Sequence, residues 1–247
     1  MSAVLGRKVV QMNRRAFLAA APLAALTQGT LGAQSVPGGS HFVERRADFD
    51  AAAFQRAVDR PEATIRQVWH ALAFHPQMFS NVKNALNGLQ FGFGHPASSI
   101  AIAIAAHGPS SVYTYSDALW SKYRLGDAFG LKDAQGNAVS SNVYLKPSHL
   151  IDAAADPDDP NGPYQDTSIE TLQRRGVVFL TCHTAVEEQA RALVKGGYAP
   201  AGMQAPQVAD DILTHLIPGA QVVPAMVATI AVLQSMHRYT YIAPAFA

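Results

Sequence analysis

The stretch Gly176-Val177-Val178-Phe179-Leu180-Thr181-Cys182 decides the fold class of this 247-residue chain. Its β-branched and aromatic residues form a continuous apolar run, which is typical of a strand buried on both faces of a sheet. Residues 99–105, in which isoleucine alternates with alanine, have the same character. Both runs are followed by helical patterns, so they predict β-α units and a mainly parallel sheet with helices on both faces.

Hydrophobic periodicity places the remaining elements around these two strands. Short apolar runs ended by turn residues predict strands, and apolar residues at three- and four-residue spacing predict helices. The predicted strands are 67–74, 99–105, 177–181, 221–223 and 238–242. The predicted helices are 76–89, 117–125, 169–175, 186–194, 208–217 and 226–236, and Ser116 is placed to cap the second of them.

The N-terminal residues have the features of an export signal. Asn13-Arg14-Arg15-Ala16-Phe17-Leu18-Ala19 resembles the twin-arginine motif, and an apolar run too short to span a bilayer follows it through Leu26. We therefore expect a signal peptide over 1–33 and an exported or periplasmic protein without a stable membrane anchor. An internal alanine-rich helix is the alternative, and Met12 is an alternative start.

The rest of the chain is predicted to form one domain. Residues 34–65 are an extended lead-in, 66–247 form the α/β domain, and a loop insertion with an acidic, proline-broken segment occupies about 131–168. Hydrophobic residues make up 49% of the chain and charged residues 15%, which indicates a globular protein. The formal charge of +1 argues against a nucleic-acid partner.

Cys182 is the one cysteine of the chain, so it cannot form an internal disulfide. It lies at the carboxyl end of a predicted strand, where parallel sheets bind ligands. Thr184 and Glu187 fit a capping box, which predicts a helix N-terminus that lowers the pKa of the thiol, with His183 acting in the same direction. A buried, unreactive cysteine is the alternative interpretation.

His107 ends the second strand and is a candidate acid or base beside Cys182. A turn histidine bonded to the backbone is the alternative for His107, and His70 is predicted to be structural. A zinc or copper site made of Cys182, His183 and His107 is a weaker alternative, since no metal-ligand spacing supports it. No glycine-rich phosphate loop is present, and we expect neither a metal nor a cofactor.

Several segments resemble the DsrE/DsrF-like family of small sulfur-handling proteins. They are residues 176–182, 216–227 and 233–234, the stretch Tyr239-Thr240-Tyr241-Ile242 and, more loosely, the turn Ala106-His107-Gly108-Pro109. The resemblance implies a flavodoxin-like three-layer α/β domain that forms homotrimers or homohexamers. It also implies that the matching Cys182 carries sulfur as a persulfide. This chain has His183-Thr184 where many relatives have other residues.

Two hypotheses about function follow. In the first, Cys182 accepts sulfane sulfur from a small sulfur compound or a partner sulfur carrier protein, His183 and His107 steer protonation, and Gly108 and Thr184 contact the substrate. In the second, the chain is a non-catalytic oligomeric binding module for a small ligand or metal ion. A thiol buried among aliphatic groups, with no cavity reaching it, would remove the basis of the first hypothesis.

Overall fold

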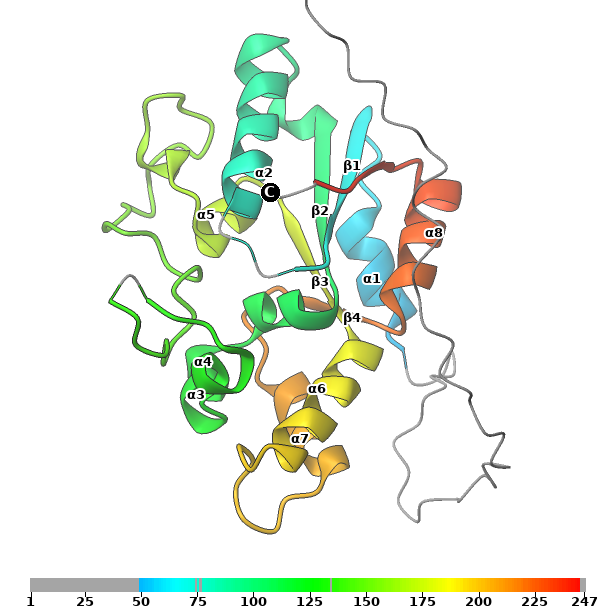
Figure 1. Cartoon of the computed structure of the whole chain (residues 1–247). Helices are drawn as coiled ribbons and strands as arrows, with labels where there is room; N and C mark the ends of the chain where they lie inside the picture. The colour runs from blue at the N-terminus through cyan, green and yellow to red at the C-terminus, as the bar shows by residue number, and fades with distance from the viewer. Residues whose placement is uncertain (1–48, 74, 76, 134, 245–247) are drawn as a thin grey trace, which may run out of the picture. The chain divides into compact units, whose positions relative to one another are not determined.

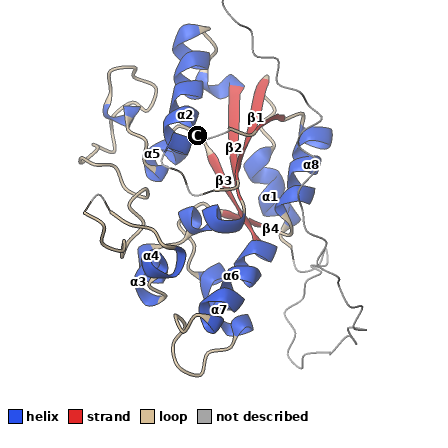
Figure 2. Cartoon of the chain, viewed as in Figure 1, coloured by secondary structure: helices blue, strands red, loops and turns tan. Residues whose placement is uncertain are grey.

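A five-stranded, all-parallel sheet organises the part of the chain that the computed structural model describes, which is residues 49–73, 75, 77–133 and 135–244 (Figures 1 and 2). The predicted signal peptide and most of the lead-in lie outside these residues, as do Phe74 and Pro76 at the predicted strand end and helix start. The strands are β1 Ile65–Ala71, β2 Ile100–Ala106, β3 Val178–Cys182, β4 Gln221–Val223 and β5 Thr240–Ile242.

The strand order is β4-β3-β2-β1-β5, so the chain moves outward in one direction through four strands and returns to the far side of β1. The α/β prediction with a parallel sheet is confirmed, and the layers are those of a flavodoxin-like fold. The outer neighbour of β1 is the last strand, β5, in this chain, whereas it is the second strand in the flavodoxin order. β1 and β5 therefore form the topological switch point.

Helices connect consecutive strands, as parallel pairing requires. The α-helices are α1 Ala51–Val58, α2 Gln77–Asn87, α3 Asp117–Lys122, α4 Leu125–Phe129, α5 Ile169–Arg174, α6 His183–Lys195, α7 Ala205–Thr214 and α8 Met226–His237. Four short helical segments are η2 Gly88–Gly92, which is π-helical, and η3 Ala97–Ser99, η4 Gly108–Thr114 and η5 Pro163–Gln165, which are 3₁₀-helical.

Some predicted boundaries are wrong for local reasons. The first strand begins at Ile65 and ends at Ala71, because its pairing with β2 starts at Ile65↔Ile100. The helix predicted over 117–125 is broken into α3 and α4, since Arg124 takes a left-handed conformation with φ 45°. Ser116 precedes α3, but its side chain makes no capping bond.

The two faces of β2 explain the layers. Its isoleucines pack with α2 and α5 on one face, in a core that includes Phe79, Leu172 and Phe179. Its alanines face a second core, which holds α1 and α8 through residues such as Phe54 and Leu233. Figure 1 shows these helix pairs on opposite sides of the sheet. A sheet buried on both faces needs the continuous apolar runs seen in the sequence.

A third core lies beyond the carboxyl ends of the strands. It joins η4, α3, α4, α6 and α7 around the fully buried Tyr115, Trp120 and Tyr123. The first part of the loop insertion packs against this region. Leu131 and Val139 join the core, and Asn142 Nδ2 donates to the carbonyls of Tyr113 and Tyr115, over 2.8 and 3.0 Å. No helix among the described residues is long and apolar enough to cross a membrane.

Candidate functional site

Cys182 is the last residue of β3 and leads directly into α6. Its side chain is 1% exposed and lies in the apolar core under α8, with Leu180, Ala185, Val223 and Met226 in the same cluster. The backbone N–H of Met226, the first residue of α8, donates to Cys182 Sγ over 3.3 Å. The thiol is therefore at the predicted place in the sheet but is covered by the helix layer.

Burial raises the pKa of the Cys182 thiol, and this effect outweighs the opposing effect of the backbone amides of Ala185, Met226 and Thr184. These amides belong to the first turns of α6 and α8, so two helix N-termini favour negative charge at the sulfur. The expected lowering of the pKa is wrong, because desolvation of the thiolate is the larger effect.

The predicted helix start at Thr184 is also wrong. Helix α6 starts at His183, with Cys182 in the N-cap position. Thr184 instead donates its hydroxyl to the carbonyl oxygen of Pro224 over 3.0 Å and its N–H to the same oxygen over 3.3 Å. Thr184 thus links α6 to the β4–α8 loop, and its hydroxyl is already engaged in a hydrogen bond within the protein. His183 is half-buried as the first helical residue.

His107, the third predicted catalytic residue, bonds to another histidine. His107 Nδ1 lies 3.3 Å from His70 Nε2, and His70 Nδ1 lies 2.8 Å from the hydroxyl of Tyr241. The two imidazole planes are 15° apart. These side chains come from the ends of β2, β1 and β5, so the cluster sits at the switch point of the sheet, where α/β folds bind ligands.

His70 is predicted from the sequence to be structural, and the structure places it in the centre of this cluster. Burial and then the charge of His107 lower the pKa of His70. The sequence does contain a signal for this cluster, because His70 and His107 lie at the ends of two neighbouring predicted strands. The register of a parallel pair brings such residues together.

Gly108, a predicted substrate-binding residue, also has a role within the fold. It takes a left-handed conformation with φ 59°, which glycine adopts without strain. Its carbonyl oxygen accepts a hydrogen bond from Gln189 Nε2 over 2.6 Å, and Gln189 Oε1 accepts one from the buried Tyr115 hydroxyl. This link joins the turn after β2 to the middle of α6.

Metal binding has no cluster to support it in the described part of the chain. No group of three histidine, cysteine, aspartate or glutamate side chains there is arranged to hold a metal ion. The combination of Cys182, His183 and His107, which is the alternative zinc or copper site, does not form such a group.

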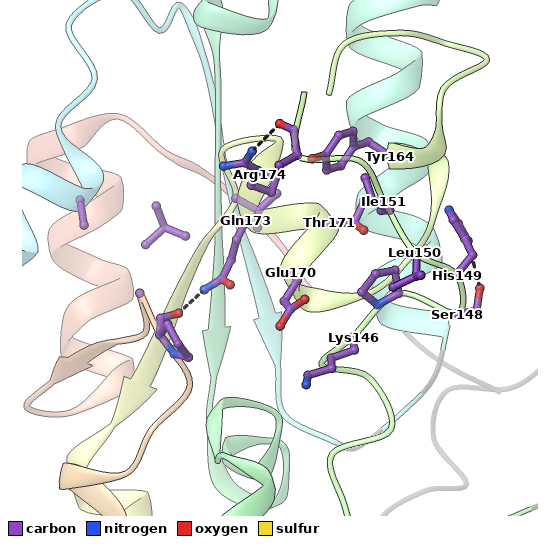
Figure 3. Close-up of a pocket in the computed structure, with 17 residues that line it drawn as sticks. Lys146, Ser148, His149, Leu150, Ile151, Tyr164, Glu170, Thr171, Gln173 and Arg174 are labelled. Atoms are coloured by element: carbon purple, nitrogen blue, oxygen red, sulfur yellow. Dashed lines mark hydrogen bonds between the residues drawn. The ribbon is translucent and has the colours of Figure 1, made fainter. Parts of the chain in front are cut away.

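A pocket of about 1090 Å³ lies at the opposite, amino-terminal edge of the sheet (Figure 3). It occurs where β3 begins, because β4 pairs with β3 only from Leu180 onward and leaves the start of β3 open on that side. Its apolar lining includes Leu150, Ile151, Val177, Val178 and Pro218. Cys182 does not line this pocket.

Charged side chains line the same pocket. Lys146 and His149 come from the loop insertion, and Glu170 and Arg174 come from α5. Figure 3 shows two hydrogen bonds that fix the positions of side chains lining the pocket. Gln173 Nε2 donates to the carbonyl of Pro218 over 2.8 Å, and Arg174 Nη2 donates to that of Ala153 over 3.3 Å.

Sequence patterns do not indicate this pocket, because its walls come from segments far apart in the chain: 57, 146–153, 164, 170–178 and 218–219. Comparison with known proteins adds no assignment, since no protein-family model, curated protein or solved structure matches the chain.

Proposed function

We propose that this chain is a binding protein for a small organic anion with an apolar body, held in the pocket at the amino-terminal edge of the sheet. The observation that carries the proposal is a 1090 Å³ pocket with an apolar lining and Lys146 and Arg174 among its wall residues. Ligand pockets are typically about 300–1,000 Å³, mostly apolar, with a few polar groups that fix orientation. This is the binding-module hypothesis with its site at the other edge of the sheet.

The charges on the wall favour an anion. Two permanent cations, Lys146 and Arg174, stand against one carboxylate, Glu170, among the residues that line the pocket. Lys146, Arg174 and Glu170 are all exposed, so each can turn toward a ligand, and Arg174 would give up its bond to the Ala153 carbonyl to do so. An alkyl carboxylate would place its chain on Ile151 and Val178 and its charge near the two cations.

Titration with octanoate, followed in backbone amide NMR spectra, tests this proposal, with uncharged octanamide as the matched ligand. We expect shifts concentrated in residues 146–153 and 170–178, and weaker binding of octanamide. The Ile151→Glu variant, which puts a charge on the apolar wall, should weaken octanoate binding by about tenfold or more. Lys132→Met, outside the pocket lining, is the control. Octanoate shifts that persist unchanged in Ile151→Glu would refute the assignment.

Burial of Cys182 among apolar side chains leaves no direct access to the thiol while α8 stays in place. A persulfide on Cys182 is therefore a second candidate only through local opening, and it is favoured by the three backbone amides that stabilise negative charge at Sγ. The Cys182 thiolate would attack a terminal sulfur of a polysulfide. The new S–S bond leaves a cysteine persulfide anion, and the polysulfide departs as an anion shortened by one sulfur. Because the thiol is 1% exposed, this reaction requires α8 to move away from it.

Intact mass after exposure to polysulfide tests this candidate. The reaction predicts a gain of one sulfur that a reductant removes and that Cys182→Ser abolishes. The same exposure at a subdenaturing urea concentration should speed the gain, because local opening uncovers the thiol. A wild-type mass that never changes below the unfolding transition would exclude the sulfur-carrier role.

Assembly into homotrimers or homohexamers is part of the proposal. Helix α8 contains no lysine, arginine, aspartate or glutamate, and Val227 and Met236 are 64% and 74% exposed on it. Large apolar side chains exposed on so apolar a helix favour a covering partner. Light scattering should give a multiple of the chain mass, and Val227→Glu with Met236→Glu should shift it to that of one chain.

A further inference from the structure

A second pocket, of about 430 Å³, lies at the same edge of the sheet and has a different chemistry. Three arginines line it: Arg60 follows α1, and Arg174 and Arg175 end α5. The loop before β2 and Asp158 of the insertion complete its wall. Arg174 also lines the larger pocket, so the two sites are neighbours.

Arg175 is the unusual residue of this pocket, because its side chain is buried although it is a cation. The residue is 9% exposed. Its Nη2 donates to Gln90 Oε1 over 3.3 Å, while Nε and Nη1 have no hydrogen-bond partner among the described residues. Buried charges in proteins are nearly always paired, so a guanidinium with two unused buried donors calls for an acceptor.

The carboxylates of the pocket do not fill that need in the structure. Asp59, Glu62 and Asp158 line it, but none of the ion pairs between described residues involves Arg175. Burial lowers the pKa of Arg175, and the charge of Asp158 acts against this from a distance. Asp158 is thus a carboxylate of this pocket whose charge acts on the guanidinium without an ion pair.

Arg60 is brought to the same place by a glycine. Gly176 has φ 85°, and a Cβ atom on it would lie 2.8 Å from Arg60 Nη1 and 2.9 Å from Nη2. Because Gly176 has no side chain, the Arg60 guanidinium can lie directly against it, next to Arg175 in the sequence. Arg60 Nη1 donates to the carbonyl of Ile100 over a long 3.4 Å.

We propose that this pocket binds a tetrahedral oxyanion, phosphate or sulfate, between Arg175 and Arg60. Guanidinium groups bind such anions through paired N–H donors, and the anion supplies the acceptor that the buried Nε and Nη1 lack. The negative charge of Asp158 opposes binding of the anion, since both charges act on the same guanidinium. The inference does not depend on the organic-anion pocket, because inorganic phosphate alone is the probe.

Thermal unfolding at constant ionic strength, with sodium phosphate or sodium sulfate replacing sodium chloride, is the first measurement. We expect Tm to rise with either oxyanion, and calorimetric titration to give one site per chain. Glycerol 3-phosphate is a second ligand: binding of both assigns a site for terminal phosphate groups, and binding of inorganic phosphate alone assigns a site for the free ion.

Three variants locate the site. Arg175→Met and Arg60→Met should each weaken the apparent Kd for phosphate by about 10-fold to 100-fold, the effect of losing charged hydrogen bonds. Asp158→Asn should tighten it, because it removes the carboxylate that opposes the anion. Arg56→Met, an exposed arginine of α1 that does not line the pocket, is the matched control.

The proposal fails if phosphate leaves the wild-type Tm where chloride does, or if Asp158→Asn weakens binding and lowers Tm without phosphate. The second result would make Asp158 the permanent partner of Arg175. If Arg175→Met does not fold, Arg60→Met and Asp158→Asn still decide the question. Octanoate binding to the larger pocket is measured separately, so either site can fail without the other.

Discussion

His70 Nε2 faces His107 Nδ1 across 3.3 Å, and this contact joins the carboxyl ends of two neighbouring strands. The pair has room for one proton between the facing nitrogens, and the Tyr241 hydroxyl occupies the other nitrogen of His70. Burial, and then the charge of His107, disfavour a proton on His70 and keep its pKa below the ordinary value.

The lowered pKa of His70 predicts a loss of stability in acid. The unfolded chain takes up a proton at this residue near the ordinary histidine pKa of 6.5, whereas the folded chain does so only at lower pH. The free energy of unfolding should therefore fall as pH drops below about 6.5 and level off below the folded pKa. His70→Asn should flatten this part of the urea-unfolding profile. His149→Asn, in an exposed loop position, should leave it unchanged, and an equal slope in wild type and His70→Asn would show that another group causes the loss.

Cys182 should react slowly with a thiol reagent such as Ellman's reagent in the native protein. Burial removes access and raises the thiol pKa, so both the collision rate and the thiolate fraction are small. The rate should rise steeply with urea below the main transition. Lys132→Cys in a Cys182→Ala background supplies an exposed control thiol away from α8, and it should react at once. Equal rates for the two cysteines would show that Cys182 is open in solution.

Tyr115→Phe should lower the free energy of unfolding by about 1–3 kcal/mol, the usual effect of leaving a buried polar group unsatisfied. The hydroxyl is fully buried and donates to Gln189 Oε1, whose amide nitrogen holds the Gly108 turn. Chemical denaturation measures the change. Tyr198→Phe, at a half-buried position where the ring packs against Arg124, should change stability much less.

Gly126→Ala should be strongly destabilising, because an added Cβ would lie 2.1 Å from the carbonyl oxygen of Val139 and 2.5 Å from its nitrogen. Backbone on both sides cannot yield as a side chain would, so the loop insertion must move off α4. We expect a loss of about 1–3 kcal/mol or more, as for overpacked cores. Gly88→Ala, a helical position with open space around it, should be neutral or slightly stabilising.

The strands were predictable because burial on both faces demands apolar runs that few other structures need. Residues 221–223 match β4 in full, and β2 and β3 each begin and end one residue later than predicted. The helix start near Cys182 was not predictable in the same way. The Thr184 and Glu187 pattern is a local signal. It fails here because the Thr184 hydroxyl donates to the carbonyl of Pro224, in the loop after the neighbouring strand β4.

Burial of individual polar groups was harder still. Arg175 follows a helix in the sequence, where a solvated arginine is the usual outcome, but it is buried and donates to Gln90, 85 residues earlier in the chain. Cys182 posed the same problem: its strand end is visible in the sequence, but the helix that covers it begins at Met226. Predicting the burial of such a side chain requires knowing how all the strands and helices of the sheet pack together.

The alanines of β2 have a consequence for the cysteine on the neighbouring strand. Ala101, Ala103 and Ala105 present only methyl groups to the α1 and α8 layer, and α8 contacts β2. The spacing between sheet and helix is therefore set by the smallest side chain that still has a Cβ. One larger residue in that row, such as valine for Ala103, would lever α8 outward and draw the Met226 amide off the sulfur. One conservative substitution in the middle of a different strand should therefore change how accessible the Cys182 thiol is.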